Sequence, residues 1–112
     1  MTIEKTRAEK IRALNDKLRQ DLIGGIAVIT PGAAALGEQA VANIFKAIAV
    51  FDDFCQANDP YEEHDFGALD VDGRRILFKI DYYDERLEWH SPDPADPDVT
   101  ERVITIMLAE EY

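Results

Sequence analysis

Several side chains in the second half of the chain could do chemistry together if one sheet brings them to the same face. The dipeptide Asp72-Gly73 predicts a β-hairpin with strands over 66–71 and 74–83. A second tight turn at Asp84-Glu85 predicts a third strand over 86–90. Side chains directly opposite each other on such strands are close enough to touch. One face then carries a row of acids, bases and possible ligands: His64, Asp81, Glu88, Lys79, His90 and Tyr83.

This row could support two kinds of chemistry. Neighbouring carboxylates disfavour double ionisation, so one of them could act as a general acid or base. The catalytic candidates are His64, Asp81, Lys79 and Glu88. Carboxylate and imidazole ligands also suit manganese, iron or zinc, and the metal candidates are His64, Asp81, Glu88 and His90. The pattern is nevertheless typical of the water-facing side of an antiparallel sheet, and we favour that interpretation.

Known catalytic and cofactor motifs are missing from the sequence. It has no glycine-rich phosphate loop, no nucleophile elbow and no helical histidine pair with an intervening glutamate. We therefore expect no cofactor. Cys55 could be a nucleophile, but it falls at the end of a predicted helix, where the helix dipole disfavours a thiolate. We expect it to be a half-buried structural residue.

Other elements must support this sheet. Apolar residues at helical spacing predict one helix over about 3–21, ended by Gly24-Gly25, and another over about 36–54. The apolar run 26–30, rich in β-branched residues, predicts a short buried strand. The predicted loop 55–63 separates the second helix from the hairpin.

A final helix is predicted after the proline-rich segment 91–97, with Asp96 as its cap and Pro97 in its first turn. Its core stripe consists of apolar residues at helical spacing: Val99, Val103, Ile106 and Met107. The sequence therefore predicts one α+β domain over residues 1–112. It is a three-stranded antiparallel meander plus one short strand, packed by three helices.

Charge is distributed unevenly along the chain, whose formal net charge is −11. Residues 1–50 carry 5 acids and 7 bases, whereas residues 51–112 carry 18 acids and 5 bases. An acidic field repels nucleic-acid phosphate, so we expect no direct nucleic-acid binding; the same field attracts a basic protein. We expect the bases of the first helix to form a solvated face: Lys5, Arg7, Lys10, Arg12, Lys17 and Arg19.

Two pairs of acids fall at the C-terminal ends of predicted helices. Asp52 and Asp53 end the second helix, and Glu110 and Glu111 end the third. Acids there are disfavoured by the helix dipole, by about 0.3–1 kcal/mol each. Locally unfavourable residues tend to mark functional surfaces. These four acids are therefore the candidate partner-binding residues.

The blocks Phe51-Asp52-Asp53-Phe54, Glu63-His64-Asp65-Phe66-Gly67, Lys79-Ile80-Asp81-Tyr82-Tyr83-Asp84 and Ser91-Pro92-Asp93-Pro94-Ala95-Asp96-Pro97 occur in this order. They resemble a family of short alphaproteobacterial proteins catalogued as domain of unknown function thirty-seven sixty-eight. The resemblance covers nearly the whole chain. It implies a free-standing bacterial protein, often encoded near plasmid or mobile-element genes, and it implies no particular activity.

We expect a non-enzymatic protein-binding module that engages a basic partner, in its sharpest form a nucleic-acid mimic that inhibits a DNA-binding or defence protein. One alternative is a metal-dependent or acid–base enzyme that uses the polar sheet face. Another is a structural homodimer subunit that pairs through a free sheet edge. A single cysteine, no signal peptide and no long apolar run predict a cytoplasmic protein with no membrane partner.

Overall fold

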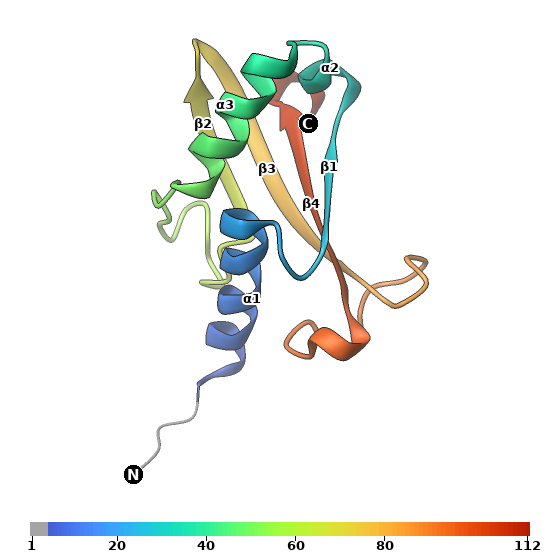
Figure 1. Cartoon of the computed structure of the whole chain (residues 1–112). Coiled ribbons are helices and arrows are strands. Elements are labelled where there is room, and N and C mark those ends of the chain that lie inside the picture. Colours follow the sequence, from blue (N-terminus) through green and yellow to red (C-terminus); the bar gives the residue numbers. More distant parts are fainter. Residues whose placement is uncertain (1–4) are drawn as a thin grey trace.

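The computed structural model describes residues 5–112 as a four-stranded sheet covered on one face by helices (Figure 1). The strands lie in the order β1, β4, β3, β2; β1 runs parallel to β4, and the other neighbours are antiparallel. Their bounds are β1 Ile26–Ile29, β2 Phe66–Val71, β3 Arg74–Tyr83 and β4 Glu101–Leu108. The helices are α1 Arg7–Asp21, α2 Pro31–Ala34 and α3 Glu38–Ala49, with 3₁₀ turns at Pro97–Val99 and Ala109–Glu111. The α+β class is confirmed.

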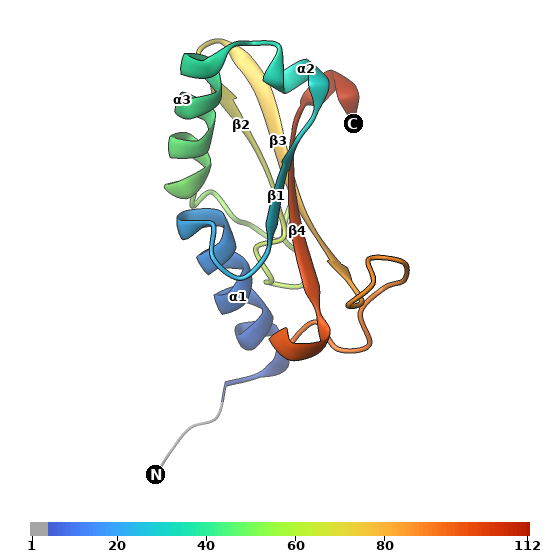
Figure 2. The same cartoon turned by 45° about the vertical axis from the view of Figure 1, so that its right-hand side comes forward.

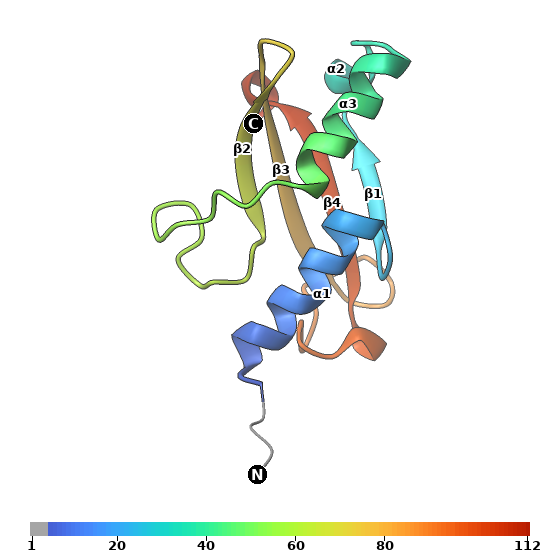
Figure 3. The ribbon, with the colours of Figure 1, turned by 60° about the vertical axis from the view of Figure 1, so that its left-hand side comes forward.

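The helices and the C-terminus lie on opposite sides of the sheet. In Figure 2, α1 and α3 are on one side of the strands and the C-terminus is on the other, and Figure 3 shows both helices in front of the sheet. The buried core therefore lies between the helices and one sheet face. It contains Leu18, Ile44, Ile48, Val71, Ile76, Phe78, Ile80, Ile104 and Ile106.

The predicted hairpin is confirmed, including its register. Val71 pairs with Arg74, and Phe66 pairs with Lys79 at the other end of the ladder. Asp72 and Gly73 both have positive φ, 53° and 81°, as the two central residues of a type I′ turn require. Because the turn has two residues, it determines which side chains of β2 and β3 face the helices.

The predicted final helix is wrong. Asp96 does cap the turn Pro97–Val99, but the chain then continues as β4. Residues 103–106 are all β-branched, which favours a strand. β4 lies between β1 and β3, and its residues are buried on both sheet faces: Ile104 and Ile106 toward the helices, Met107 away from them. An apolar run buried on both faces gives no clear alternation, and it can be mistaken for a helix.

The predicted third strand over 86–90 is also wrong. Asp81 faces Val103 of β4 instead of Glu88, and Lys79 faces Thr105 instead of His90. Within residues 5–112, the one β-bridge made by the segment 86–90 is an isolated bridge between Tyr83 and His90. The proline-rich segment does not precede a helix; it belongs to the long β3–β4 connection over 84–100.

The first two predicted helices are present with different bounds. α1 starts at Arg7, where the Thr6 hydroxyl accepts a hydrogen bond from Glu9 N–H; positions 3 and 4 of the predicted helix lie outside the described residues. The predicted helix over 36–54 is shorter and ends at Ala49, and α2 precedes it. Within residues 5–112, no helix is long and apolar enough to cross a membrane.

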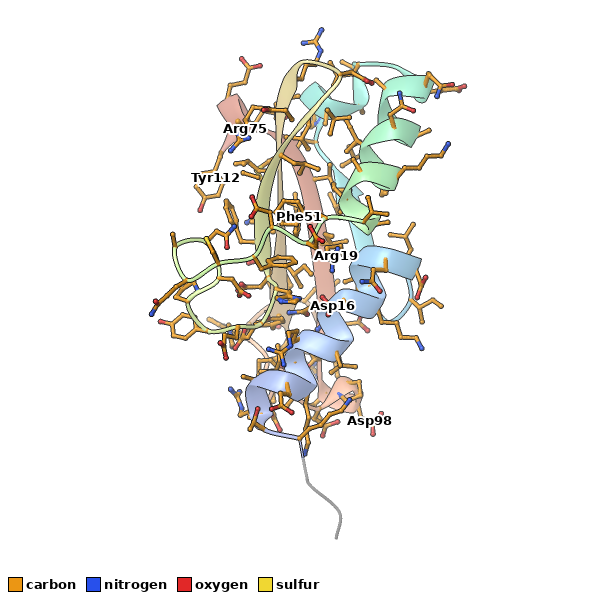
Figure 4. The ribbon with its side chains drawn as sticks, turned by 90° about the vertical axis from the view of Figure 1, so that its left-hand side faces the viewer. Asp16, Arg19, Phe51, Arg75, Asp98 and Tyr112 are labelled. Atoms are coloured by element: carbon orange, nitrogen blue, oxygen red, sulfur yellow. The ribbon has the colours of Figure 1, made fainter. Side chains whose placement is uncertain are left out.

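The sequence predicted that Arg19 belongs to a solvated face, and this prediction is wrong. Its side chain is buried on α1, and its guanidinium donates hydrogen bonds to the carbonyl oxygens of Ile48 and Phe51, at 2.9 and 2.8 Å. Figure 4 shows Asp16 and Arg19 on α1, beside Phe51. Arg19 therefore binds the C-terminal end of α3, where a positive charge is favoured by the helix dipole.

Candidate functional site

The predicted row of acids and bases is divided between two places. Asp81, Glu88 and His90 line one hollow at the end of β3, and Lys79 makes an ion pair with Asp81 at 3.2 Å. His64 lies elsewhere, because its φ of 57° takes it out of the extended chain before β2. The catalytic candidates therefore do not form one site. Within residues 5–112, no three His, Cys, Asp or Glu side chains are arranged to hold a metal ion.

The hollow at the end of β3 has acidic and aromatic walls. Its volume is about 400 Å³, and its lining residues are Asp65, Ile80, Asp81, Tyr82, Tyr83, Glu88, Trp89 and His90. Burial raises the pKa of Asp65, and the negative charge of Glu63 raises it further. The Asp65 carboxyl group is therefore harder to ionise than an exposed carboxyl group.

His64 is held between α1 and the loop that precedes β2. Its Nδ1 lies 2.8 Å from Asp16 Oδ1, and its Nε2 lies 3.7 Å from Asp59 Oδ2. The backbone N–H of His64 donates to Asp59 Oδ1, and its ring stacks on Phe54 with centroids 3.8 Å apart. The imidazole therefore joins α1 to the loop over 50–65, and sequence patterns could not place Asp16 beside it.

Cys55 is exposed and lines a hollow of about 390 Å³ together with His64, Arg12 and Asp59. The expectation of a half-buried thiol at a helix end is therefore wrong, because α3 ends six residues earlier at Ala49. Within residues 5–112, no hydrogen bond joins the Cys55 thiol to His64. The geometry does not make Cys55 and His64 a catalytic pair.

The β3–β4 connection begins with a turn held by one carboxylate. Asp84 Oδ1 accepts hydrogen bonds from the backbone N–H groups of Arg86, Glu88 and Trp89, at 3.2, 3.0 and 3.4 Å. These bonds, the one from Glu88 above all, hold the pKa of Asp84 below its usual value. The turn presents Leu87 and Trp89 to solvent, with exposed fractions of 48% and 73%. Sequence reasoning missed this surface because it assigned 86–90 to a strand.

We call residues 84–101 the acidic end of the molecule. Among its side chains Arg86 is the one lysine or arginine, and there are seven acids: Asp84, Glu85, Glu88, Asp93, Asp96, Asp98 and Glu101. Arg7 of α1 lies 3.6 Å from Asp93 and offsets part of this charge. The acidic end therefore combines exposed apolar side chains with a strong negative charge.

The four acids predicted to bind a partner do not form one surface. Asp52 and Asp53 follow α3 on the helical side of the sheet, whereas Glu110 and Glu111 lie near the C-terminus on the other side (Figure 2). Asp52 and Asp53 lie beyond the end of α3 at Ala49, and Glu110 and Glu111 end a 3₁₀ turn after β4 instead of the predicted α-helix. The carbonyl groups at the end of α3 are bound by Arg19, so Asp52 and Asp53 do not face them unopposed.

Glu111 binds within its own chain. Its carboxylate accepts hydrogen bonds from the Thr30 hydroxyl at 2.6 Å, Leu108 N–H at 2.9 Å and Gly32 N–H at 3.2 Å. The Thr30 bond in particular holds the pKa of Glu111 below its usual value. Glu111 therefore ties the C-terminal turn to the start of α2, where negative charge is favoured.

We predict that Glu111→Gln lowers the free energy of unfolding at pH 7. Because folding lowers the pKa of Glu111, its stabilisation is present above the unfolded-state pKa and is lost as pH falls through the folded-state pKa. The difference in the free energy of unfolding between Glu111→Gln and the wild type should thus disappear in acid. Urea unfolding between pH 7 and pH 3 measures it. Glu110→Gln removes the same charge from an exposed neighbour and should have no such effect. Equal destabilisation by both variants would contradict the prediction.

Comparison with known proteins gives a family but no described relative. No curated protein and no solved structure matches the chain. A family described as "Protein of unknown function (DUF3768)" matches residues 29–111, most of the chain, in agreement with the resemblance seen in the sequence. The chain therefore belongs to this family.

Proposed function

We propose that the protein binds a basic partner protein through its acidic end, with Trp89 as the central contact. The observation that carries this proposal is the 73% exposure of Trp89 on a turn fixed by Asp84. Tryptophan is enriched among the residues that contribute most to binding energy at protein interfaces. An exposed tryptophan within a field of carboxylates fits a partner with an apolar pocket rimmed by lysine or arginine.

The turn held by Asp84 favours binding because its backbone is already ordered before a partner arrives. Three backbone N–H groups bond to Asp84, and the backbone N–H of Asp84 donates to the carbonyl oxygen of Trp89 at 2.8 Å. A preorganised loop loses less conformational entropy on association than a mobile one. The surrounding acids would speed the encounter with a basic surface and make it sensitive to salt.

This surface replaces the four acids predicted from the sequence as our candidate interface. Glu111 is engaged with Thr30, Gly32 and Leu108, and α3 and the C-terminus lie on different sides of the sheet (Figure 2). The proposed class of partner stays the same. A nucleic-acid mimic is its narrowest form, and competition with DNA separates that form from other basic partners.

The test compares tagged wild-type protein with Trp89→Ala and Tyr61→Ala in affinity purification from host lysate, eluted by a salt gradient. Tyr61 is a matched control, since it is 72% exposed and lies in the loop before β2. We expect a discrete basic protein to bind the wild type and Tyr61→Ala, and to bind Trp89→Ala about tenfold or more weakly. Equal binding by all three proteins, or no bound protein, would overturn the proposal. Release of the partner by duplex DNA would identify a nucleic-acid mimic.

A further inference from the structure

β1 forms an unprotected edge of the sheet. The strand order places β4 on one side of it, and within residues 5–112 no strand lies on the other. Ile26 and Val28 are 40% and 43% exposed, so the strand predicted over 26–30 is present but is not buried as predicted. Edge strands usually carry a charge, a proline or a bulge that prevents pairing with another chain. No charged residue occurs between Leu22 and Gly37, although the chain as a whole carries a net charge of −11.

The backbone groups that β1 presents outward can be assigned from its register. Thr30 N–H donates to the carbonyl oxygen of Ile106 at 3.0 Å, and Ile29 is the register partner of Ile106. In a parallel ladder, alternate residues bond to the neighbouring strand. Val28 and Thr30 therefore bond to β4, and the N–H and C=O groups of Ala27 and Ile29 point away from the sheet.

We propose that β1 pairs antiparallel with β1 of a second copy of this chain, about a two-fold axis at Val28. In that register Ala27 of one copy and Ile29 of the other exchange two hydrogen bonds, and the symmetric pair exchanges two more. All four outward backbone groups of each β1 are then satisfied. The two sheets join into one sheet of eight strands, with the helices of both copies on the same face.

A second copy fits this edge because the chain on both sides of β1 carries no charge. Leu22 and Ile23, which precede β1, are 50% and 53% exposed, and Ala34, which follows it, is also exposed. Pairing of the two β1 strands brings the uncharged segments 22–37 of the two copies together. Two chains of net charge −11 repel elsewhere, so an uncharged contact is where they can approach.

The proposed dimer contact is separate from the proposed partner surface. The contact uses the β1 edge, whereas the proposed partner surface is the acidic end, residues 84–101.

The register can be tested by cross-linking. In the proposed dimer Val28 faces its own copy in a non-hydrogen-bonded pair, with Cα atoms about 4.5 Å apart, which a disulfide can span. In a Cys55→Ser background, Val28→Cys should form a disulfide dimer with oxidised glutathione. Ile26→Cys is the matched control, because it is equally exposed on the same face but would face Thr30 of the other copy. Equal cross-linking at both positions would overturn the proposed register.

Sedimentation equilibrium tests the dimer without a disulfide. The wild type should have twice the monomer mass of 12.6 kDa at micromolar concentration. Val28→Lys should be a folded monomer, since a lysine on an edge strand opposes pairing, and circular dichroism checks that it is folded. A monomeric wild type at all concentrations up to 1 mM, or a dimeric Val28→Lys, would overturn the proposal.

Discussion

Replacing Asn15 with leucine is expected to lower the free energy of unfolding by about 3–5 kcal/mol, although the two side chains are similar in size. Asn15 is completely buried on α1. Its amide Oδ1 accepts from Arg102 Nε at 2.7 Å, and its Nδ2 donates to the Tyr82 hydroxyl at 2.7 Å and to the Glu63 carbonyl oxygen at 3.0 Å. A leucine at position 15 leaves the Arg102 guanidinium, the Tyr82 hydroxyl and the Glu63 carbonyl oxygen without their hydrogen bonds to the Asn15 amide.

The cost is large because one of those groups is a buried charge. Arg102 is 1% exposed, and within residues 5–112 no carboxylate makes an ion pair with it. Burial lowers the pKa of Arg102, whose guanidinium also bonds to the Pro94 carbonyl and lies 5.0 Å from the Tyr82 ring. The Tyr82 hydroxyl donates to Glu63 Oε1 at 2.8 Å, and this is how the network reaches a negative charge.

Urea unfolding of matched variants isolates this effect. Gln20→Leu makes the same kind of change at an exposed position of α1 and should alter stability by less than about 0.5 kcal/mol. The double variant Asn15→Leu/Arg102→Met should cost less than the sum of the two single variants, by about 1 kcal/mol or more, because the second change removes the stranded charge. Additive effects would show that Asn15 does not support Arg102.

Buried arginines are also where sequence reasoning failed. Arg102 interrupts the apolar face of β4 that continues through Ile104 and Ile106, so the alternation typical of a strand was obscured. Arg19 is eight residues from Ile11, a spacing that places it on the buried face of α1, but its charge led us to group it with exposed bases such as Lys17. Composition predicts charged residues at the surface; only the tertiary arrangement shows which carbonyl groups require a buried donor.

The hairpin was predictable because one dipeptide determines it. Asp72-Gly73 adopts the two positive φ angles that its turn needs, so the pairing of β2 with β3 follows from local geometry. The prediction of a polar row across three strands was wrong because it depended on which strand lies next to β3. That neighbour is β4, which follows a connection of 17 residues over 84–100. Pairing across so long a connection depends on the whole core, not on the sequence of one turn.

Replacing Arg19 with methionine should lower the free energy of unfolding by about 3 kcal/mol and loosen the loop over 50–65. Arg19 donates to the carbonyl oxygens of Ile48 and Phe51 and to Asp16 Oδ1 at 3.0 Å. Its guanidinium also lies 5.2 Å from the Phe54 ring centroid. Methionine keeps the apolar stem but leaves the end of α3 without its positive charge and donors.

The loosening should be local, because Arg19 joins α1 to the segment that leads to His64. Amide hydrogen exchange should become faster over 50–65 than over β3 and β4, which pair with each other across the middle of the sheet. Lys17→Met removes the same charge from an exposed position of α1 and should leave exchange in this loop unchanged. Uniform acceleration over the whole chain would contradict a local role. Unchanged exchange in Arg19→Met would show that the loop is held by the His64 contacts with Asp16 and Asp59 alone.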